Sequence, residues 1–376
     1  MQRSTKISSS TIHLNPPEPD QAEISLFGPG VGECTVLHIG EGKWFIIDSC
    51  RCPKTKQPIA LRYLDSLGVN VAESVVGILL THWHKDHIDG AFDLFKSCEN
   101  ALLYFSHALS SREMFHLCAL YKIDIHASID KEIREFKNIV DSIFNSKRKD
   151  RLIPVSANYV FFDKSNSPVN TKMVALTPSP VSTTEAITQL AGGIPKAGFS
   201  NHKLRKNVIG KENINAVAIW FGFGNWSALL GSDLELSADD NKSWKSIFKS
   251  QIYQQLSLSK SLLYKVAHHG SSNGHHNDIY TQLLSNNPIA IATAYTPSKL
   301  PKRTDIERIK NHCSELTVTR DAHSNTKLKL DPMVEKELKA IATTRTILNE
   351  KIGHIQIRIT DQGIVTSEAS ESCVCY

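Results

Sequence analysis

The fold of this protein is decided by residues 79–90, which read Leu79-Leu80-Thr81-His82-Trp83-His84-Lys85-Asp86-His87-Ile88-Asp89-Gly90. Three imidazoles and one carboxylate fall within positions 82–87, directly after the apolar run Val75–Leu80. A short apolar run of this kind predicts a buried strand, so the polar side chains lie where that strand turns toward a helix. On such a loop His82 and His84 can face one side while Asp86 and His87 face the other. This arrangement predicts two adjacent divalent metal ions, Zn²⁺ or, where carboxylates are plentiful, Mn²⁺.

The composition excludes several classes of protein. The chain has 376 residues, of which 41% are hydrophobic and 22% charged, so it is globular rather than disordered. It contains no apolar run of the ~18–20 residues that a membrane helix needs, and no signal-peptide pattern, so we expect a cytoplasmic protein with no membrane partner. The 8 cysteines form no CxxC pair, which disfavours a structural zinc ribbon. The net charge of +5 permits an anionic partner without requiring one.

Hydrophobic periodicity predicts a mixed α/β sandwich, because strands and helices alternate without a strict βαβ repeat. Polar and Pro-containing residues at 1–22 predict a disordered or extended lead. The main domain is expected over 23–320, with a helical insertion at about 105–155. Residues 177–212 are expected to form a long loop with at most one short helix. The remaining residues, 321–376, are expected to be an extension that packs on the same domain.

Two further strand ends carry polar groups. The apolar residues 227–230 lead to Asp233, and the apolar run 262–267 leads to His268-His269-Gly270-Ser271. With HxHxDH at 82–87, this order of motifs resembles the metallo-β-lactamase superfamily. The HHGS form resembles more narrowly the stand-alone relatives of the metallo-β-lactamase-like domain of the DNA-uptake protein ComEC. The resemblance covers about 23–320 and implies an αββα sandwich of two mixed β-sheets flanked by helices.

The resemblance also implies a set of site residues. Two metal ions would share a bridging hydroxide, which is a nucleophile for hydrolysis at neutral pH. Asp86 would also orient the hydroxide or take its proton, and Asp48 would support the metal loop without binding the metal. His268 and Lys265 are candidates for the leaving-group acid, although Lys265 is equally well explained as an outward-facing strand residue. The implied metal ligands are His82, His84, Asp86, His87, Asp233 and His269.

The chain departs from the family pattern in two places. Ser232 stands where the family usually has a glycine. The third histidine of the first metal site is also missing, and the corresponding segment includes Asn213 instead. Water, Asn213 or a nearby histidine such as His202 would have to complete that site, so we expect either a weaker first site or a single tightly held ion.

The substrate remains open between three hypotheses. The first is a phosphodiesterase or nuclease, because basic clusters at 147–151, 202–206 and 299–303 can meet phosphates. The second is a hydrolase of a small acyl, lactone or amide substrate, and the third is a metal-impaired binding or regulatory protein with the same fold. Expected partners are a nucleic acid or nucleotide, a second copy in a homodimer, or an operon-encoded protein. The candidate substrate-binding residues are Lys203, Arg205, Lys206, Lys302 and Arg303.

Overall fold

The computed structural model describes residues 12–109, 131–146, 149–165, 169–193, 212–324, 331–341 and 351–376. Within these ranges, no helix combines the length and the apolar character that crossing a membrane requires.

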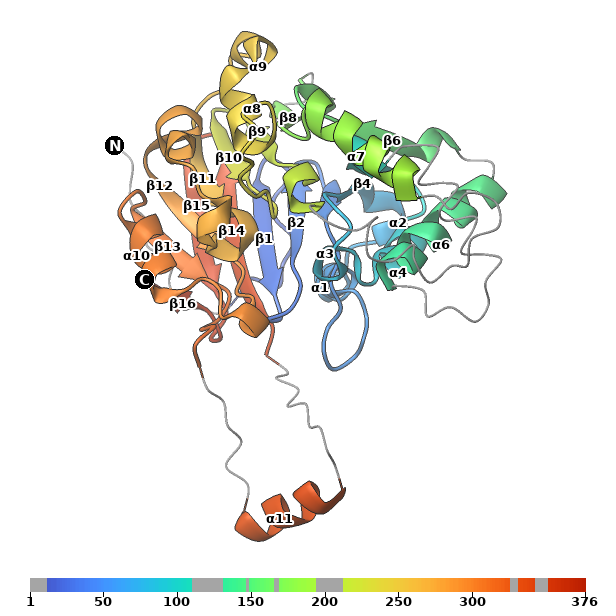
Figure 1. The fold of residues 1–376 in the computed structure, drawn as a ribbon, viewed down its shortest axis with the longest axis vertical. Helices are drawn as coiled ribbons and strands as arrows, with labels where there is room; N and C mark the ends of the chain where they lie inside the picture. Colours follow the sequence, from blue (N-terminus) through green and yellow to red (C-terminus); the bar gives the residue numbers. More distant parts are fainter. Residues whose placement is uncertain are drawn as a thin grey trace.

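Two mixed β-sheets form the centre of the molecule (Figure 1). In the first sheet, β3, β4, β5 and β6 run parallel and the remaining pairs are antiparallel. Its strands, in spatial order, are β15 (Gly363–Ala369), β14 (Gly353–Thr360), β1 (Ala22–Gly28), β2 (Cys34–Ile39), β3 (Trp44–Ile47), β4 (Val75–Leu80), β5 (Leu102–Ser106) and β6 (Leu152–Val155).

The second sheet has the same mixed character. Strands β10, β11, β12 and β13 run parallel, and the outer pairs are antiparallel. Its strands, in spatial order, are β16 (Val374–Cys375), β13 (Glu315–Val318), β12 (Leu284–Ala292), β11 (Ser261–Lys265), β10 (Trp226–Leu230), β9 (Ile219–Phe223), β8 (Thr171–Ala175) and β7 (Tyr159–Lys164).

Three apolar layers hold the sheets and helices together. The inner faces of the two sheets pack on each other, with Leu26 and Leu79 from the first sheet and Phe221 and Leu263 from the second in one buried cluster. Helices α1 (Ile59–Ser66), α4 (Ala91–Ser97) and α6 (Lys131–Asn145) cover the outer face of the first sheet. Helices α8 (Ser243–Lys249) and α10 (Arg303–Lys310) cover the outer face of the second. The central strands are therefore buried on both faces, which explains their continuous apolar sequences. The predicted αββα sandwich is confirmed.

The remaining helices are short or lie at the edges of the sandwich. Helix α11 lies apart from the two sheets (Figure 1). These remaining helices are α2 (Val71–Ser74), α3 (Lys85–Ile88), α7 (Pro180–Gly193), α9 (Gln251–Gln255) and α11 (Pro332–Ile341).

The prediction of a long loop at 177–212 was wrong for its first part, because α7 is a helix of 14 residues. Ser179 explains its start, since its Oγ accepts a hydrogen bond of 3.1 Å from the backbone N–H of Ser182. Pro180 then occupies the first helical position, where a missing N–H costs nothing. The Ser-Pro pair was the available signal, but the threonine-rich sequence that follows obscured it. Residues 194–211 lie outside the described part of the chain.

The C-terminal segment is built into both sheets. Strand β14 pairs along the whole length of β1, and β16 closes the edge of the second sheet. The described part of the N-terminal lead is also anchored, because the backbone N–H of His13 donates to the side chain of Gln356 at 3.0 Å. The core of the sandwich therefore needs residues beyond the last recognisable motif.

The described part of the 105–155 insertion packs beside the metal loop. Helix α6 lies against α3 and α4. Arg51 connects them, with its guanidinium 2.8 Å from Asp89, 2.7 Å from Asp93 and 3.3 Å from Glu135 of α6. Helix α6 of the insertion therefore packs against and supports the segment that carries HxHxDH.

Candidate metal centre

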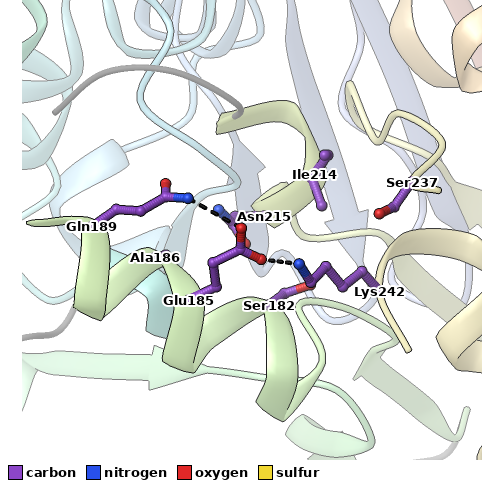
Figure 2. Close-up of a pocket in the computed structure, with 8 residues that line it drawn as sticks. All are labelled: Ser182, Glu185, Ala186, Gln189, Ile214, Asn215, Ser237 and Lys242. Carbon is purple, nitrogen blue, oxygen red and sulfur yellow. Dashed lines mark hydrogen bonds and ion pairs between the residues drawn. The ribbon is translucent and has the colours of Figure 1, made fainter. Parts of the chain in front are cut away.

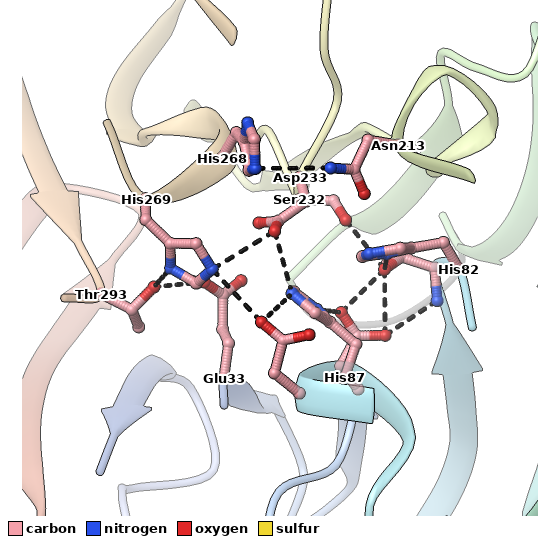
Figure 3. A network of polar contacts seen from close by, with 12 residues as sticks. Glu33, His82, His87, Asn213, Ser232, Asp233, His268, His269 and Thr293 are labelled. Carbon is pink, nitrogen blue, oxygen red and sulfur yellow. Dashed lines mark hydrogen bonds and ion pairs between the residues drawn. The ribbon is translucent and has the colours of Figure 1, made fainter. Parts of the chain in front are cut away.

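Side chains from the two sheets meet where their strands end (Figure 3). His87 follows β4 of the first sheet, while Asp233 and His269 follow β10 and β11 of the second. Strands β10 and β11 are parallel, so their carboxyl ends lie at the same edge of the sheet. Packing of the sheets then brings that edge against the end of β4.

Four of the predicted ligands form one compact cluster of Asp86, His87, Asp233 and His269, whose ligand atoms lie within 4.8 Å of one another. Nε2 of His87 and Nε2 of His269 each lie 3.3 Å from Oδ2 of Asp233. Nε2 of His269 also lies 3.5 Å from Oδ2 of Asp86. Two imidazoles and two carboxylates that converge on one point make a donor set suited to Zn²⁺ or Mn²⁺.

The buried imidazoles are anchored through one nitrogen and bare at the other. Nδ1 of His82 lies 3.0 Å from the Thr81 hydroxyl, and Nδ1 of His87 lies 2.7 Å from Oδ2 of Asp48. Nδ1 of His269 lies 2.9 Å from the Thr293 hydroxyl. The Nε2 atoms of all three rings are buried and have no hydrogen-bond partner. Histidines that bind metals show this pattern, in which one nitrogen is fixed by an outer partner and the other is left for the ion.

His82 and His84 lie at the side of the four-residue cluster. Their rings are 4.9 Å apart, edge to face, and the His82 ring is 4.3 Å from that of His87. Neither residue belongs to the cluster of Asp86, His87, Asp233 and His269. The structure therefore brings Asp86, His87, Asp233 and His269 together, with His82 and His84 beside them.

Asp48 lies behind the cluster and is buried. Its carboxylate accepts hydrogen bonds from Nδ1 of His87 and from the backbone N–H of Thr81 at 2.8 Å. The Thr81 hydroxyl also donates to Asp48, and it accepts from the Ser232 hydroxyl at 2.8 Å. Asp48 thereby orients the His87 ring and joins the first sheet to the turn before Asp233.

The backbone of the site is strained. Asp48, Ser232, His268 and His269 have φ values of 61°, 48°, 47° and 51°. Such left-handed conformations are unfavourable for residues with a Cβ, and they cluster at functional sites. The value at Ser232 gives a physical reason for the glycine that the family usually has at this position.

The electrostatics of the cluster favour protonated imidazoles beside ionised carboxylates. Burial disfavours the charged form of His87, but the carboxylates of Asp233 and Asp48 outweigh it and raise the pKa of His87 well above its ordinary value. For His269, burial is likewise outweighed by Asp233 and then by Asp86, which raise its pKa to about 9. Burial and the neighbouring His87 and His84 instead lower the pKa of His82 well below its ordinary value.

Asn213 and His268 contact each other beside the cluster. Nδ1 of His268 lies 2.7 Å from Oδ1 of Asn273, and its Nε2 lies 3.3 Å from Nδ2 of Asn213. The same Asn213 nitrogen donates to Glu235 at 2.8 Å, whereas Oδ1 of Asn213 is buried and unpartnered. Asn213 therefore has an oxygen to offer a cation, and the role of His268 as a proton donor stays a prediction.

The prediction that Lys265 faces outward was wrong. Its side chain is buried, its Nζ forms an ion pair with Glu33, and the same nitrogen donates to the Ser232 carbonyl at 3.0 Å. Its ammonium group is therefore held between Glu33 and Ser232. An alternating strand pattern cannot reveal this placement, because the partner of Lys265 comes from a turn more than two hundred residues away in the sequence.

The candidate substrate-binding residues separate into two groups. Lys302 and Arg303 are exposed at the start of α10, whose Arg308 donates to the Gly270 carbonyl at 2.7 Å. They therefore lie on a helix that contacts the HHGS turn. Lys203, Arg205 and Lys206, with His202, fall outside the described residues.

Sequence reasoning missed three residues beside the cluster. Glu33 lies in the turn before β2, and Thr293 and Tyr295 follow β12. The Tyr295 ring stacks on His269 with the ring centroids 5.1 Å apart and the planes at 24°. Strand β12 is parallel to β11, so the rule that parallel strands end at one edge was the signal that pointed to Thr293 and Tyr295.

A small pocket is lined in part by Ile214 and Asn215 of the 3₁₀ turn Glu212–Asn215 (Figure 2). Asn215 and an ion pair between Glu185 of α7 and Lys242 line it. None of the predicted metal ligands lines this pocket. It is therefore separate from the metal centre.

Part of the chain is similar in sequence to a known family. Residues 27–155 match the family model described as "Metallo-beta-lactamase superfamily". The likeness to that superfamily extends over these residues. The two mixed sheets with flanking helices are the sandwich of that fold, and the His and Asp cluster lies at its strand ends. A search of curated proteins found no match.

Solved structures with low similarity to this chain were also found. The hydrolase AbOPH of the beta lactamase superfamily is 14% identical, with 58% of this chain and 72% of that chain covered and a TM-score of 0.31. The dizinc quorum-quenching lactonase AidC is 16% identical, with 54% and 57% covered and a TM-score of 0.29. A metallo-beta-lactamase mutant from Cronobacter sakazakii is 12% identical, with 64% and 75% covered and a TM-score of 0.32.

Proposed function

We propose that this protein is a metal-dependent hydrolase of phosphodiesters, with nucleic acid or a nucleotide as its substrate. The observation that carries the metal-dependent part is the cluster of Asp86, His87, Asp233 and His269, in which both imidazoles direct bare Nε2 atoms at two carboxylates. Divalent ions bound there would activate water and stabilise negative charge. The motif order supports placing the chain near the ComEC-like branch.

The two carboxylates differ in exposure, which supports different roles for them. The Asp233 side chain is 3% exposed and lies between two imidazoles, so it fits the role of a shared ligand. The Asp86 side chain is 16% exposed and faces His269, so it can both bind and accept a proton from a reacting water. The His268 side chain is 17% exposed, so solvent and a leaving group can reach it.

The proposed preference for phosphodiesters rests on positive charge beside the HHGS turn. Lys302 and Arg303 are exposed on α10, beside the HHGS turn, and can pair with phosphate oxygens. A small neutral acyl, lactone or amide substrate would not need these cations, so their removal separates the two substrate classes.

The test is a hydrolysis assay of the protein loaded with Zn²⁺ or Mn²⁺. The substrates are bis-p-nitrophenyl phosphate, plasmid, single-stranded DNA, p-nitrophenyl acetate and a homoserine lactone. We expect phosphodiester cleavage that Asp233→Asn abolishes and Asp240→Asn leaves unchanged, because Asp240 pairs with Lys245 and Lys249 away from the cluster. Lys302→Glu with Arg303→Glu should raise KM for DNA without lowering kcat for bis-p-nitrophenyl phosphate. Hydrolysis of only the ester or lactone would overturn the phosphodiester proposal, and no hydrolysis by metal-loaded protein would favour a binding or regulatory role.

A further inference from the structure

A buried ion pair lies behind the metal cluster. Lys265 at the end of β11 and Glu33 in the turn before β2 are 1% and 3% exposed. Nζ of Lys265 contacts Oε1 of Glu33 and donates to the Ser232 carbonyl at 3.0 Å. Removing two charges from water costs several kcal/mol per ion, so a buried pair of this kind is weak as a source of stability. Its position next to the ligands suggests what it does instead.

The side chain of Glu33 determines the direction of the hydrogen bonds that reach His269. Oε2 of Glu33 accepts from the Thr293 hydroxyl at 2.5 Å, and Nδ1 of His269 lies 2.9 Å from the same hydroxyl oxygen. A threonine hydroxyl has one proton, and it is given to Glu33. Nδ1 of His269 must therefore carry the proton that it donates to Thr293, which leaves Nε2, the nitrogen that faces Asp86 and Asp233, to offer its lone pair to an ion.

The same pair also fixes the backbone that carries the carboxylate ligands. The backbone N–H of Glu33 donates to the Asp86 carbonyl at 2.9 Å. The Ser232 carbonyl that Lys265 holds belongs to the left-handed residue directly before Asp233. Gly32 permits this close approach, since a Cβ there would lie 2.6 Å from the Cβ of Cys50.

We propose that Glu33, Thr293 and Lys265 form a positioning relay, which sets the tautomer of His269 and holds the turn before Asp233. The relay determines how tightly the cluster of Asp86, His87, Asp233 and His269 binds a divalent ion. Its members do not touch reacting atoms. The inference rests on the metal-binding part of the proposed function and does not depend on which substrate is hydrolysed.

The test compares Thr293→Val with Thr293→Ser in the full chain. Removal of the hydroxyl should weaken Zn²⁺ binding about 10–100-fold, measured by competition with a chromophoric chelator. The serine variant keeps a hydroxyl and should restore wild-type affinity. Thr171→Val is the matched control, because the Thr171 hydroxyl is also buried but donates to the Ile39 carbonyl, away from the cluster.

Two further measurements separate positioning from simple packing. The metal-free melting temperature of Thr293→Val should fall no further than that of Thr171→Val. In zinc-loaded protein with ¹⁵N-labelled histidine, the Nδ1 proton of His269 should exchange slowly with solvent in wild type and in Thr293→Ser, and faster in Thr293→Val. The double variant Glu33→Gln/Lys265→Met should weaken Zn²⁺ binding in the same way.

The relay is overturned if Thr293→Val binds Zn²⁺ as tightly as wild type. It is also overturned if Thr293→Ser is as weak as Thr293→Val, because the methyl group would then be the cause. If wild type binds Zn²⁺ but hydrolyses nothing, the proposed function fails while the relay stands. If wild type binds no divalent ion, both fail.

Discussion

Asp48 and His87 form a fully buried pair, in which Nδ1 of His87 lies 2.7 Å from Oδ2 of Asp48 while Nε2 of the same ring points at Asp233. The pair joins the end of β3 to the metal loop. Nδ1 of His87 is thus bound by the protein, whereas Nε2 can bind an ion.

This pair leads to a prediction for Asp48→Asn. An asparagine can turn its NH₂ group toward Nδ1 of His87, which favours the tautomer with the proton on Nε2 and blocks that nitrogen as a ligand. Zn²⁺ affinity should fall about 10–100-fold, as for other outer partners of ligating histidines. Chelator competition measures it, and unchanged affinity would show that Asp48 does not orient the ring.

The two predicted ion sites should respond differently to loss of a ligand. The cluster of Asp86, His87, Asp233 and His269 is complete without His84. His84→Ala should therefore retain one tightly held ion, whereas His269→Ala should lose it. Metal content after dialysis, measured by mass spectrometry, checks this, and equal losses in both variants would contradict it.

Metal binding should release protons. The pKa of His269 is raised to about 9 by Asp233 and Asp86 against the effect of burial, so its ring is charged at neutral pH in the metal-free protein. An ion needs the Nε2 lone pair, so below pH 9 it must displace a proton, and affinity should fall as the pH falls. Calorimetry at pH 7.5 in two buffers of different ionisation enthalpy should show at least one proton released, and identical heats would refute the prediction.

Acid should destabilise the fold through His354, far from the metal centre. His354 is buried against Phe27, with ring centroids 4.1 Å apart, and burial lowers its pKa to about 3. Below pH ~6.5 His354 binds a proton in the unfolded chain but not in the folded chain. The free energy of unfolding therefore falls by about 1.4 kcal/mol per pH unit.

The variant His354→Phe removes this proton linkage. Between pH 7 and pH 5 its loss of stability should be smaller than that of wild type by about 2 kcal/mol, measured by urea unfolding. His276→Phe is the control, because the His276 ring also lies against a phenylalanine, Phe248, but is partly exposed. A pH dependence unchanged in His354→Phe would mean that the ring is protonated in the folded state.

The sequence by itself determined the layered fold and the residue types of the cluster. Apolar runs such as Val75–Leu80 are long enough to identify buried strands, and HxHxDH packs its donors so closely that their meeting depends only on local geometry. The same local logic located Asp233 and the HHGS turn. It failed for α7, where a capping serine and Pro180 decided the start of a helix against a weak apolar pattern.

Tertiary structure alone decided what surrounds the ligands. Glu33, Lys265 and Thr293 lie far apart in the chain and carry no shared motif, and they meet only because two sheets pack face to face with their strand ends aligned. The direction of a hydrogen bond through Thr293, and hence the nitrogen that His269 offers, depends on a partner 260 residues away. The spacing of residues along the chain determines which side chains a short loop carries. Tertiary packing determines which atoms of those side chains remain without a hydrogen-bond partner.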